Sequence, residues 1–514
     1  MSKMNSGRRK IITALILVGL VSILSCTKKP KISNFSPKEG RMDDEVTIAG
    51  ENFAETLDGN IVKFNNVEAT VVSATKDQII TKVPSAAETG RISVTTDAGT
   101  AYSDLYFKVL SQTTWTVMIY LDADNNLESA GIDDFLEMSS VGSTGDVKIV
   151  VQMDRHPYYT DDYGDWAGTK RFLIHKDDTP EGFAVEDLGE QNMGDPAVLQ
   201  NFVEWAMTNY PAEHYALSIW DHGDGWRLLR QGLSENVGLR RSEGGAEWAV
   251  TKAVSSDDTD GDILYMKEVQ NALEAAISNV EDHSGAPVKL DVLGYDACLM
   301  GMTEVAYAMR NVADYVVGSE DLEPGDGWPY DTVLAELVSS PATTPKQLST
   351  LIVTQYYDSY SGWDSITQSA VDVAQIDAVC TAIDAFVDVA QTDWGDLKTA
   401  RRQTVDYHFG GSSVWGMDLR HFAENVSQYV SSPDIKTAAD RLKDTVDSFV
   451  IAERHSPDLE GTGGIAIYFP VDRNAFDIDP EHTGYMESNT YWPVDFVRDF
   501  SWDNWLLQYY ANIP

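Results

Sequence analysis

Cysteine is scarce in this sequence, with only 3 residues among 514. Cys26, Cys298 and Cys380 lie far apart and form none of the paired spacings that bind zinc. So few thiols exclude a fold that depends on a disulfide framework. Cys380 falls within a helical pattern and is expected to be a core residue, so Cys26 and Cys298 need separate explanations.

Basic residues are the second scarcity: 38 Lys and Arg face 81 Asp and Glu, for a formal net charge of −43. A chain this acidic repels phosphate groups, which argues against nucleic acid and anionic membrane surfaces as partners. The sequence also lacks a glycine-rich phosphate loop. The charge favours basic substrates and suits an exported protein, although solubility alone is the simpler explanation.

The N-terminus lacks an apolar run long enough for a transmembrane helix. The largely apolar segment Ile11 to Leu24 has 14 residues and follows basic residues at positions 3, 8, 9 and 10, as in a secretory signal peptide. It ends on Leu24-Ser25-Cys26, which looks like a bacterial lipobox. We therefore predict that residues 1–25 are a lipoprotein signal peptide and that Cys26 is lipidated.

The mature protein is then expected in the bacterial cell envelope as a lipid-anchored protein, with an uncleaved anchor as the alternative. Thr27 follows Cys26. An Asp at this position would indicate retention in the inner membrane, and the sequence has none there. We therefore expect the outer membrane, with the periplasmic or surface face left open.

Residues 26–110 read as a small all-β domain, because short β-rich runs alternate with turn residues at regular spacing. The segments FSPKEG, VTIAGENF, VKFNNVEATV and TGRISVTTDAG are similar to immunoglobulin-like IPT/TIG domains. We interpret this domain as a spacer that holds the rest of the protein off the membrane. Glycan or protein binding is the alternative, since the fold alone gives no function.

From Trp115 onward, strand and helix patterns alternate, as in WTVMIYL at 115–121 and the helical pattern up to Met138. Such alternation predicts an α/β domain over 115–514, with a mostly parallel sheet flanked by helices. Near the end of the chain, the apolar run Gly463 to Phe469 is expected to be a buried strand that completes this sheet.

Cys298 follows one predicted strand of this domain, Val288 to Leu293, and a helical pattern begins near Met302. The carboxyl end of a strand is where an open α/β sheet collects its chemistry. His222 follows another predicted strand, Tyr215 to Trp220. If the two strands are parallel neighbours, the imidazole lies beside the thiol and can activate it as a nucleophile. Alone, either residue fits a structural role; the pair favours catalysis.

The segments WDHGDGW and GYDACLMGMTEVAY, in this order and spacing, resemble the clostripain family of cysteine peptidases. The resemblance implies a caspase-like α/β fold, a His–Cys dyad and cleavage after Arg or Lys. His222 would be the general base and Cys298 the nucleophile. The backbone N–H groups of Gly223 and Cys298 would hold the oxyanion.

By the same resemblance, Asp296 and Asp326 would line the pocket for the basic side chain of the substrate. Asp296 is two residues before Cys298, so we expect it on the rim of the site. In the stretch of Asp326, three other acidic residues compete for the role: Glu320, Asp321 and Glu323.

The polar, glycine-rich stretch 227–262 separates the two site segments. Related enzymes are cut in a loop of this region during activation, and Arg240-Arg241 is a candidate site for self-cleavage. An ordinary exposed loop is the alternative.

Two acidic clusters resemble calcium loops only in part: Asp122, Asp124 and Asn126 in one, and 256–267 in the other. The chemistry of a His–Cys dyad requires no cofactor. Some clostripain-like enzymes need calcium, so calcium is kept as a candidate with its ligands unassigned.

These observations predict an exported, monomeric cysteine endopeptidase whose substrates are proteins or peptides with Arg or Lys. Two alternatives stay open. One is a non-catalytic surface lipoprotein that uses a peptidase-like fold for adhesion, and the other is a transpeptidase with the same dyad.

Overall fold

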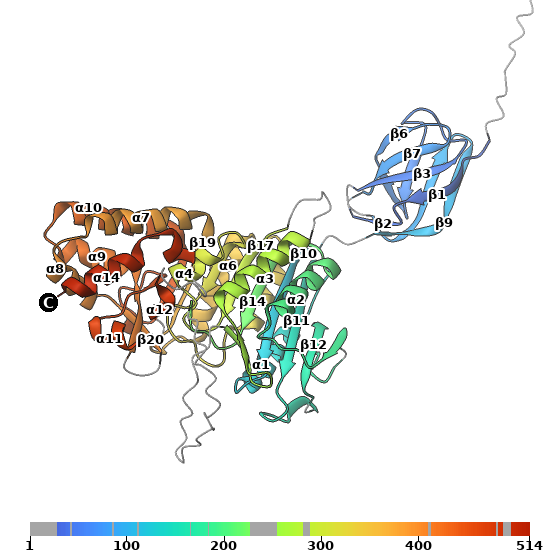
Figure 1. Ribbon diagram of the computed structural model, residues 1–514. Coiled ribbons are helices and arrows are strands. Elements are labelled where there is room, and N and C mark those ends of the chain that lie inside the picture. The colour runs from blue at the N-terminus through green and yellow to red at the C-terminus, as the bar shows by residue number, and fades with distance from the viewer. Residues whose placement is uncertain are drawn as a thin grey trace, which may run out of the picture. The chain divides into compact units, whose positions relative to one another are not determined.

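The computed structural model describes residues 28–41, 44–84, 87–109, 113–164, 166–182, 184–226, 254–280, 288–409, 413–479, 482–486 and 495–513. The chain divides into two compact units, Met1–Ser111 and Gln112–Pro514 (Figure 1). Cys26, Arg240 and Arg241 lie outside the described residues. Within those residues, no helix has both the length and the apolar character needed to cross a membrane.

The N-terminal unit is a sandwich of two sheets, which confirms the expected all-β domain. Strands alternate buried and exposed residues, so that Val46 and Ile48 of one sheet face Val62 and Phe64 of the other across one core. One sheet has the order β1 (Lys31–Ser36), β3 (Glu45–Glu51), β7 (Gln78–Lys82), β6 (Val71–Ala74). The other has the order β2 (Glu39–Gly40), β9 (Gly99–Val109), β8 (Gly90–Thr96), β4 (Ile61–Phe64), β5 (Val67–Ala69).

The second unit is built on a nine-stranded sheet. Its strands, in spatial order, are β13 (Glu186–Gly189), β12 (Gly168–Leu173), β11 (Val147–Arg155), β10 (Thr113–Ala123), β14 (Ala212–Trp220), β17 (Leu290–Asp296), β18 (Ala313–Gly318), β19 (Thr367–Asp372) and β22 (Val450–His455). The central run from β11 to β18 is parallel, and the strands outside it pair antiparallel. The predicted sheet is therefore confirmed at its centre, with antiparallel edges.

Helices cover both faces of this sheet, because alternate strand residues point to opposite faces. In β10, Met118 and Tyr120 join one core, and Ile119 and Leu121 join the other. The first face carries α2 (Pro196–Asn209), α3 (Met266–Asn279) and α4 (Thr303–Ala308). The second face carries α1 (Glu128–Val141), α5 (Tyr330–Ser339) and α6 (Pro345–Ser359).

The C-terminal third extends the first core with helices that gather at one end of the unit (Figure 1). They include α7 (Ile376–Val389), α8 (Trp394–Arg402), α9 (Leu419–Tyr429), α10 (Pro433–Phe449), α11 (Arg473–Ile478) and α14 (Trp502–Asn512). Short elements complete the unit: α12 (His482–Tyr485), α13 (Asp495–Asp499) and the 3₁₀ turns Asp162–Gly164, Val373–Gln375 and Pro457–Leu459.

The expectation for the apolar run 463–469 is wrong in one respect. The run forms a buried strand, β23 (Ala466–Tyr468), but this strand pairs with β21 (Ser413–Asp418) and not with the main sheet. With β20 (Asp406–Phe409) they form a separate three-stranded sheet. The main sheet instead ends on β13 at one edge and on β22, which directly follows α10, at the other.

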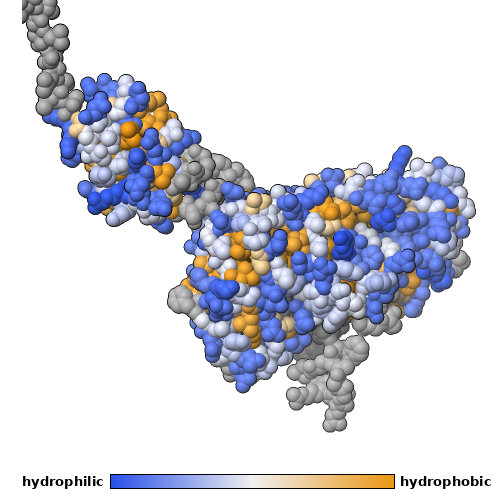
Figure 2. Space-filling model, turned by 180° about the vertical axis from the view of Figure 1, so that it is seen from behind, coloured by the Kyte–Doolittle hydropathy of each residue, from blue (hydrophilic) through white to orange (hydrophobic). Residues whose placement is uncertain are grey.

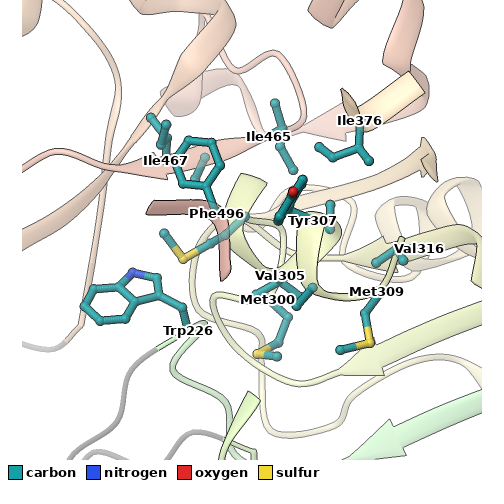
Figure 3. Close-up of a cluster of buried hydrophobic side chains, with 14 of the residues drawn as sticks. Trp226, Met300, Val305, Tyr307, Met309, Val316, Ile376, Ile465, Ile467 and Phe496 are labelled. Atoms are coloured by element: carbon teal, nitrogen blue, oxygen red, sulfur yellow. The ribbon is translucent and has the colours of Figure 1, made fainter. Parts of the chain in front are cut away.

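β23 nevertheless matters for the site, because it holds the turn that begins α4. The backbone N–H of Ala466 donates to the carbonyl of Gly301 at 2.8 Å, and the Thr303 hydroxyl donates to the carbonyl of Ala466 at 3.0 Å. Figure 3 shows Ile465 and Ile467 above Met300 and Val305, in one buried cluster. The outer surface is mostly hydrophilic on the face seen in Figure 2, with hydrophobic residues scattered over it.

Candidate active site

The register of two central strands aligns His222 with Cys298. In the parallel ladder of β14 and β17, Trp220 is paired with Asp296. His222 and Cys298 each lie two residues further along, at the carboxyl edge of the sheet. A Cβ on Gly223 would collide with the carbonyl oxygen of Cys298 and lie 3.1 Å from its amide nitrogen. The two segments are thus in backbone contact, and only glycine fits at this position.

Cys298 lies in a tight turn between β17 and α4. The next residue, Leu299, has φ of 63°, a left-handed conformation that a branched side chain rarely adopts. Two hydrogen bonds hold the turn: the Leu299 N–H donates to the Asp321 carbonyl at 3.1 Å, and the Gly301 N–H donates to the Ser319 carbonyl at 2.6 Å. The surrounding structure therefore fixes a strained backbone at the thiol, which is common at reactive sites.

The segment after β18 lies against the thiol. The backbone N–H of Glu323 donates to Cys298 Sγ at 3.2 Å. Burial raises the pKa of the Cys298 thiol to about 12, and the neighbouring carboxylates of Glu323, Asp321 and Asp224 act in the same direction. The thiol is therefore protonated at neutral pH in this arrangement. Attack by this sulfur requires a base.

The imidazole of His222 is oriented by Asn126, a contact that the sequence did not indicate. His222 Nε2 lies 3.0 Å from Asn126 Oδ1. Asn126 belongs to the loop between β10 and α1. Because an amide oxygen only accepts, this contact is a hydrogen bond when the ring proton is on Nε2. In the sequence, Asn126 fitted part of a calcium loop, and nothing linked it to a histidine 96 residues away.

Asp296 is buried, and not on the rim as expected. Asp296 is 4% exposed, and its Oδ2 accepts a hydrogen bond from the backbone N–H of Trp328 at 3.1 Å. Burial raises its pKa to about 6. The pKa values of Asp134 and Glu323 are also raised, by burial first and by the charge of Asp296 second. We call Asp134, Asp296 and Glu323 the Asp296 cluster.

Asp326 is exposed and lies beside this cluster. It lines a hollow of about 530 Å³ whose other acidic residues are Asp133, Asp134, Glu137 and Asp331. Gly327, with φ of 59°, brings the backbone so close that a Cβ there would be 3.0 Å from Asp296 Oδ1 and 3.3 Å from Asp134 Oδ2. Asp296 and Asp326 are thus brought to one region, with Glu323 on the buried side.

The acidic residues of α1 were not predicted from the sequence. Asp134 accepts from the indole N–H of Trp220 at 2.6 Å, and burial raises the pKa of Glu137 to about 7. The only sequence signal was the run Asp133-Asp134 to Glu137 within a helical pattern, which equally fits a solvated helix face. Cys380 is buried in α7, as expected of a core thiol.

The two partial calcium loops meet in space. Asp124 lies at the end of β10, and the backbone N–H of Asp258, from the other loop, donates to its carbonyl at 2.8 Å. Neither loop has the ligand order of an EF-hand, so any cation here would be bound by residues from both. Asp122 is buried and accepts from the hydroxyl of Ser255 at 2.7 Å.

Two families and a curated protein are similar to this chain. Residues 119–509 match the model of the clostripain family, and residues 30–109 match the IPT/TIG domain. A curated relative, clostripain of Hathewaya histolytica, is 30% identical over 356 residues, which are 61% of this chain and 62% of the relative. The chain thus spans less than two thirds of that protein's length.

Two solved structures share the fold. A secreted C11 cysteine protease from Bacteroides thetaiotaomicron, in complex with an irreversible peptide inhibitor, has a TM-score of 0.54 at 21% identity. An inactive zymogen C11 protease from Parabacteroides distasonis has a TM-score of 0.52 at 19% identity. They cover 76% and 78% of this chain and 99% of their own. These likenesses confirm the caspase-like α/β fold.

Proposed function

The chain belongs to the clostripain family of cysteine peptidases, and we propose that it is an endopeptidase that cleaves after Arg or Lys with Cys298 as nucleophile and His222 as base. One observation carries the proposal. Trp220 pairs with Asp296, so His222 and Cys298, each two residues further along, lie at the same sheet edge. The acidic hollow beside Asp296 suits a substrate side chain that carries a positive charge.

The proposed reaction begins with a proton transfer. His222 takes the proton of the Cys298 thiol, and the sulfur attacks the carbonyl carbon of the scissile bond. The C–S bond forms, the C–N bond breaks, and His222 returns the proton to the leaving amine. Water, deprotonated by His222, then hydrolyses the thioester and restores the thiol. The N–H groups of Gly223 and Cys298 are proposed to hold the oxyanion, since their backbones are in contact.

Specificity for Arg or Lys is proposed to rest on Asp296 and Asp326. Burial raises the pKa values of the three carboxyl groups of the Asp296 cluster, and the charge of Asp296 adds to the effect on Asp134 and Glu323. A guanidinium entering the hollow would supply positive charge and would form charge-assisted hydrogen bonds. An arginine side chain is favoured over a neutral one because it lowers the cost of ionising buried acids.

The first test is turnover of a fluorogenic Arg peptide by protein without residues 1–25. We expect Cys298→Ala to reduce kcat/KM on the order of a thousandfold or more. Cys380→Ala is the matched control, because it removes the other described cysteine from a core position and should leave kcat unchanged. Equal activity of Cys298→Ala and the parent would overturn the proposal.

A peptide series with Lys, Ala or Asp in place of Arg then reports on the pocket. Addition of an amine acceptor, followed by the mass of the product, distinguishes hydrolysis from transpeptidation.

Processing is proposed on the sequence alone. Cys26 is the lipidation candidate, and Cys26→Ser should move the protein from the membrane fraction to the soluble fraction. Arg240 and Arg241 are the candidates for self-cleavage, and a double Ala variant should then stay full length where the parent is cut. Export is supported by the likeness to a secreted C11 protease, and a monomer is the proposed state.

A further inference from the structure

An exposed group of aromatic rings follows β11. The rings belong to His156, Tyr158 and Tyr159, and we call these three residues the Tyr158 patch. Tyr158 is 86% exposed, more than any other large hydrophobic side chain in the described residues. The ring centroid of His156 lies 5.5 Å from that of Tyr158 and 4.4 Å from that of Tyr159. Such distances are typical of aromatic rings in contact, so the three rings form one surface.

A buried ion pair fixes the loop that carries the patch. Arg155, the last residue of β11, is 0% exposed, and its Nε donates to Glu128 Oε1 at 2.7 Å. Its two terminal nitrogens donate to the backbone carbonyls of Thr160, Asp162 and Tyr163 at 3.4, 2.9 and 3.3 Å. Glu128 Oε2 accepts from the N–H of Thr160 at 3.1 Å. Both charges of a buried pair thus bind the backbone of this loop, and charge-assisted bonds of this kind are strong.

A second contact ties the patch to the neighbouring hairpin of β15 (Val254–Asp257) and β16 (Asp262–Leu264). The hydroxyl of Tyr159 donates to Asp258 Oδ2 at 2.7 Å. Within the loop, the backbone N–H of Tyr158 donates to His156 Nδ1 at 3.1 Å. The patch is therefore held from two sides, by α1 through Glu128 and by the hairpin through Asp258. The fold presents the Tyr158 ring to solvent from a fixed position.

The register of the sheet places the patch on the same edge as the dyad. One row of paired residues crosses the parallel strands β11, β10, β14 and β17 (Figure 1): Met153, Leu121, Trp220 and Asp296. His222 and Cys298 lie two residues beyond this row, and the patch begins three residues beyond it, at His156. Neighbouring strands are about 4.8 Å apart, so β11 lies about 10 Å from β14 and about 14 Å from β17.

The proposed chemistry sets the direction in which a substrate crosses this edge. The basic side chain before the scissile bond is directed to Asp296, at the end of β17. The leaving amine lies beside His222, because His222 returns the proton to it. The substrate residues after the scissile bond then continue from β14 toward β10 and β11. An extended chain covers about 3.3 Å per residue, so about three residues span the distance from β14 to β11.

We propose that the Tyr158 patch is a substrate subsite that binds an aromatic or other large apolar side chain about three residues after the scissile bond. The subsite rests on the proposed function and adds a second determinant of specificity to it. An aromatic side chain can stack on the exposed ring of Tyr158, which removes apolar surface of both from water. Asp161 and Asp162, exposed on the same loop, would repel an acidic side chain at this position.

The experiment compares two kinds of substrate for the full chain. An arginyl aminocoumarin amide ends in a small leaving group and does not reach the patch. Internally quenched peptides continue after the Arg, with either Phe or Ala as the third residue beyond it. We expect kcat/KM to be about tenfold higher for the Phe peptide, because a stacked aromatic ring adds binding energy. The difference should lie mainly in KM, since substrate and transition state share this contact.

Tyr158→Ala should abolish the preference for Phe and leave turnover of the amide unchanged. Tyr158→Phe keeps the ring and should keep the preference. The matched control is Tyr102→Ala, which removes another exposed tyrosine, in the N-terminal unit, and should change the turnover of neither substrate. Because Tyr158 is exposed, its replacement is expected to fold, and turnover of the amide reports directly that the site is intact.

The outcomes separate the subsite from the proposed function. Equal cleavage of the Phe and Ala peptides by the parent, or an unchanged preference in Tyr158→Ala, would overturn the subsite alone, provided that the amide is turned over. Loss of amide turnover in Tyr158→Ala would show that the loop supports the dyad, and would also overturn the subsite. If the parent cleaves neither kind of substrate, the proposed function fails and the subsite fails with it.

Discussion

The Asp296 cluster and the group of Asp124, Asp154, Glu190, Asp257 and Asp260 lie at the same edge of one sheet and are both acidic, yet different donors hold them. We call the second the Asp124 group. In the first, each carboxyl group accepts from a nitrogen donor: Trp220 Nε1 for Asp134, Trp328 N for Asp296 and Gln368 Nε2 for Glu323. In the second, Asp124 and Asp257 accept from backbone N–H groups. Each group keeps one buried carboxylate oxygen without a partner in the described part of the chain, Glu323 Oε2 in the first and Asp124 Oδ2 in the second.

The difference follows from where each cluster lies. The Asp296 cluster is packed between the sheet and α1, beside a hollow that opens to solvent. A side chain with several N–H donors can enter the hollow. Its positive charge allows the carboxyl groups to lose the protons that their raised pKa values would otherwise keep on them. The Asp124 group lies between loop ends, with carboxylates from four segments turned toward one another. Backbone N–H groups of these loops fix its carboxylates.

The strongest way to break this comparison is Asp296→Asn. We expect kcat/KM for Arg peptides to fall roughly a hundredfold, because one charge-assisted interaction of about 3 kcal/mol is lost. Turnover of an Ala peptide, however slow, should not fall in proportion. The measurement is a pair of steady-state assays.

A variant that loses Arg and Ala turnover equally would show that Asp296 supports the fold of the site and not its specificity. Asp331→Asn, at the first turn of α5 and on the edge of the hollow, provides a comparison within the same region. Its effect on Arg peptides should be smaller, because Asp331 is only half-buried, whereas Asp296 is buried.

Asn126 tests whether the loop between β10 and α1 positions the imidazole of His222. Asn126→Ala removes the acceptor for His222 Nε2 and should lower kcat about fivefold with little change in KM, since one hydrogen bond contributes about 1 kcal/mol. Asn126→Asp keeps an acceptor oxygen and should restore most of kcat. It should also move the acid limb of the pH–rate profile to higher pH, because a carboxylate favours the protonated imidazole.

If Asn126→Ala and Asn126→Asp have equal activity and the same pH profile, the residue is structural and does not position His222.

Local patterns in the sequence were sufficient for the elements and for part of the site. Apolar runs that end at His222 and shortly before Cys298 predicted two strand ends, and a parallel sheet brings such ends to one edge. The contacts of Asn126 and Asp134 could not be found in this way, because they depend on how α1 docks on the sheet. The burial of Asp296 depends on the segment 321–328, which folds back over it.

The late apolar run shows the same limit. Its strand character follows from local composition, but its partner does not, since strand pairing is non-local and many edges compete. In the structure, the run is held by β21 and by the turn after Cys298. The two calcium patterns were incomplete as single loops, and only the fold joins Asp124 to the hairpin that carries Asp257.

The smallest expected effect is on stability, and it tests whether the Asp296 cluster is short of positive charge. Burial raises the pKa of Asp296 from its usual value near 4 to about 6, and the pKa of Asp134 is raised as well. The folded protein therefore binds more protons than the unfolded chain between about pH 4 and pH 6, so its unfolding free energy falls as pH rises through this window. Asp134→Asn removes one of the carboxyl groups but keeps an acceptor for Trp220 Nε1. It should raise the unfolding free energy at pH 7.5 by about 1 kcal/mol and have little effect at pH 4.

Denaturant unfolding of the Cys298→Ala protein at these two pH values measures the difference. If Asp134→Asn destabilises the protein equally at both pH values, the hydrogen bond to Trp220 outweighs the repulsion. The Asp296 cluster and the Asp124 group would then differ less in charge than in shape, and selection of an arginine side chain would have to come from the form of the hollow beside Asp326.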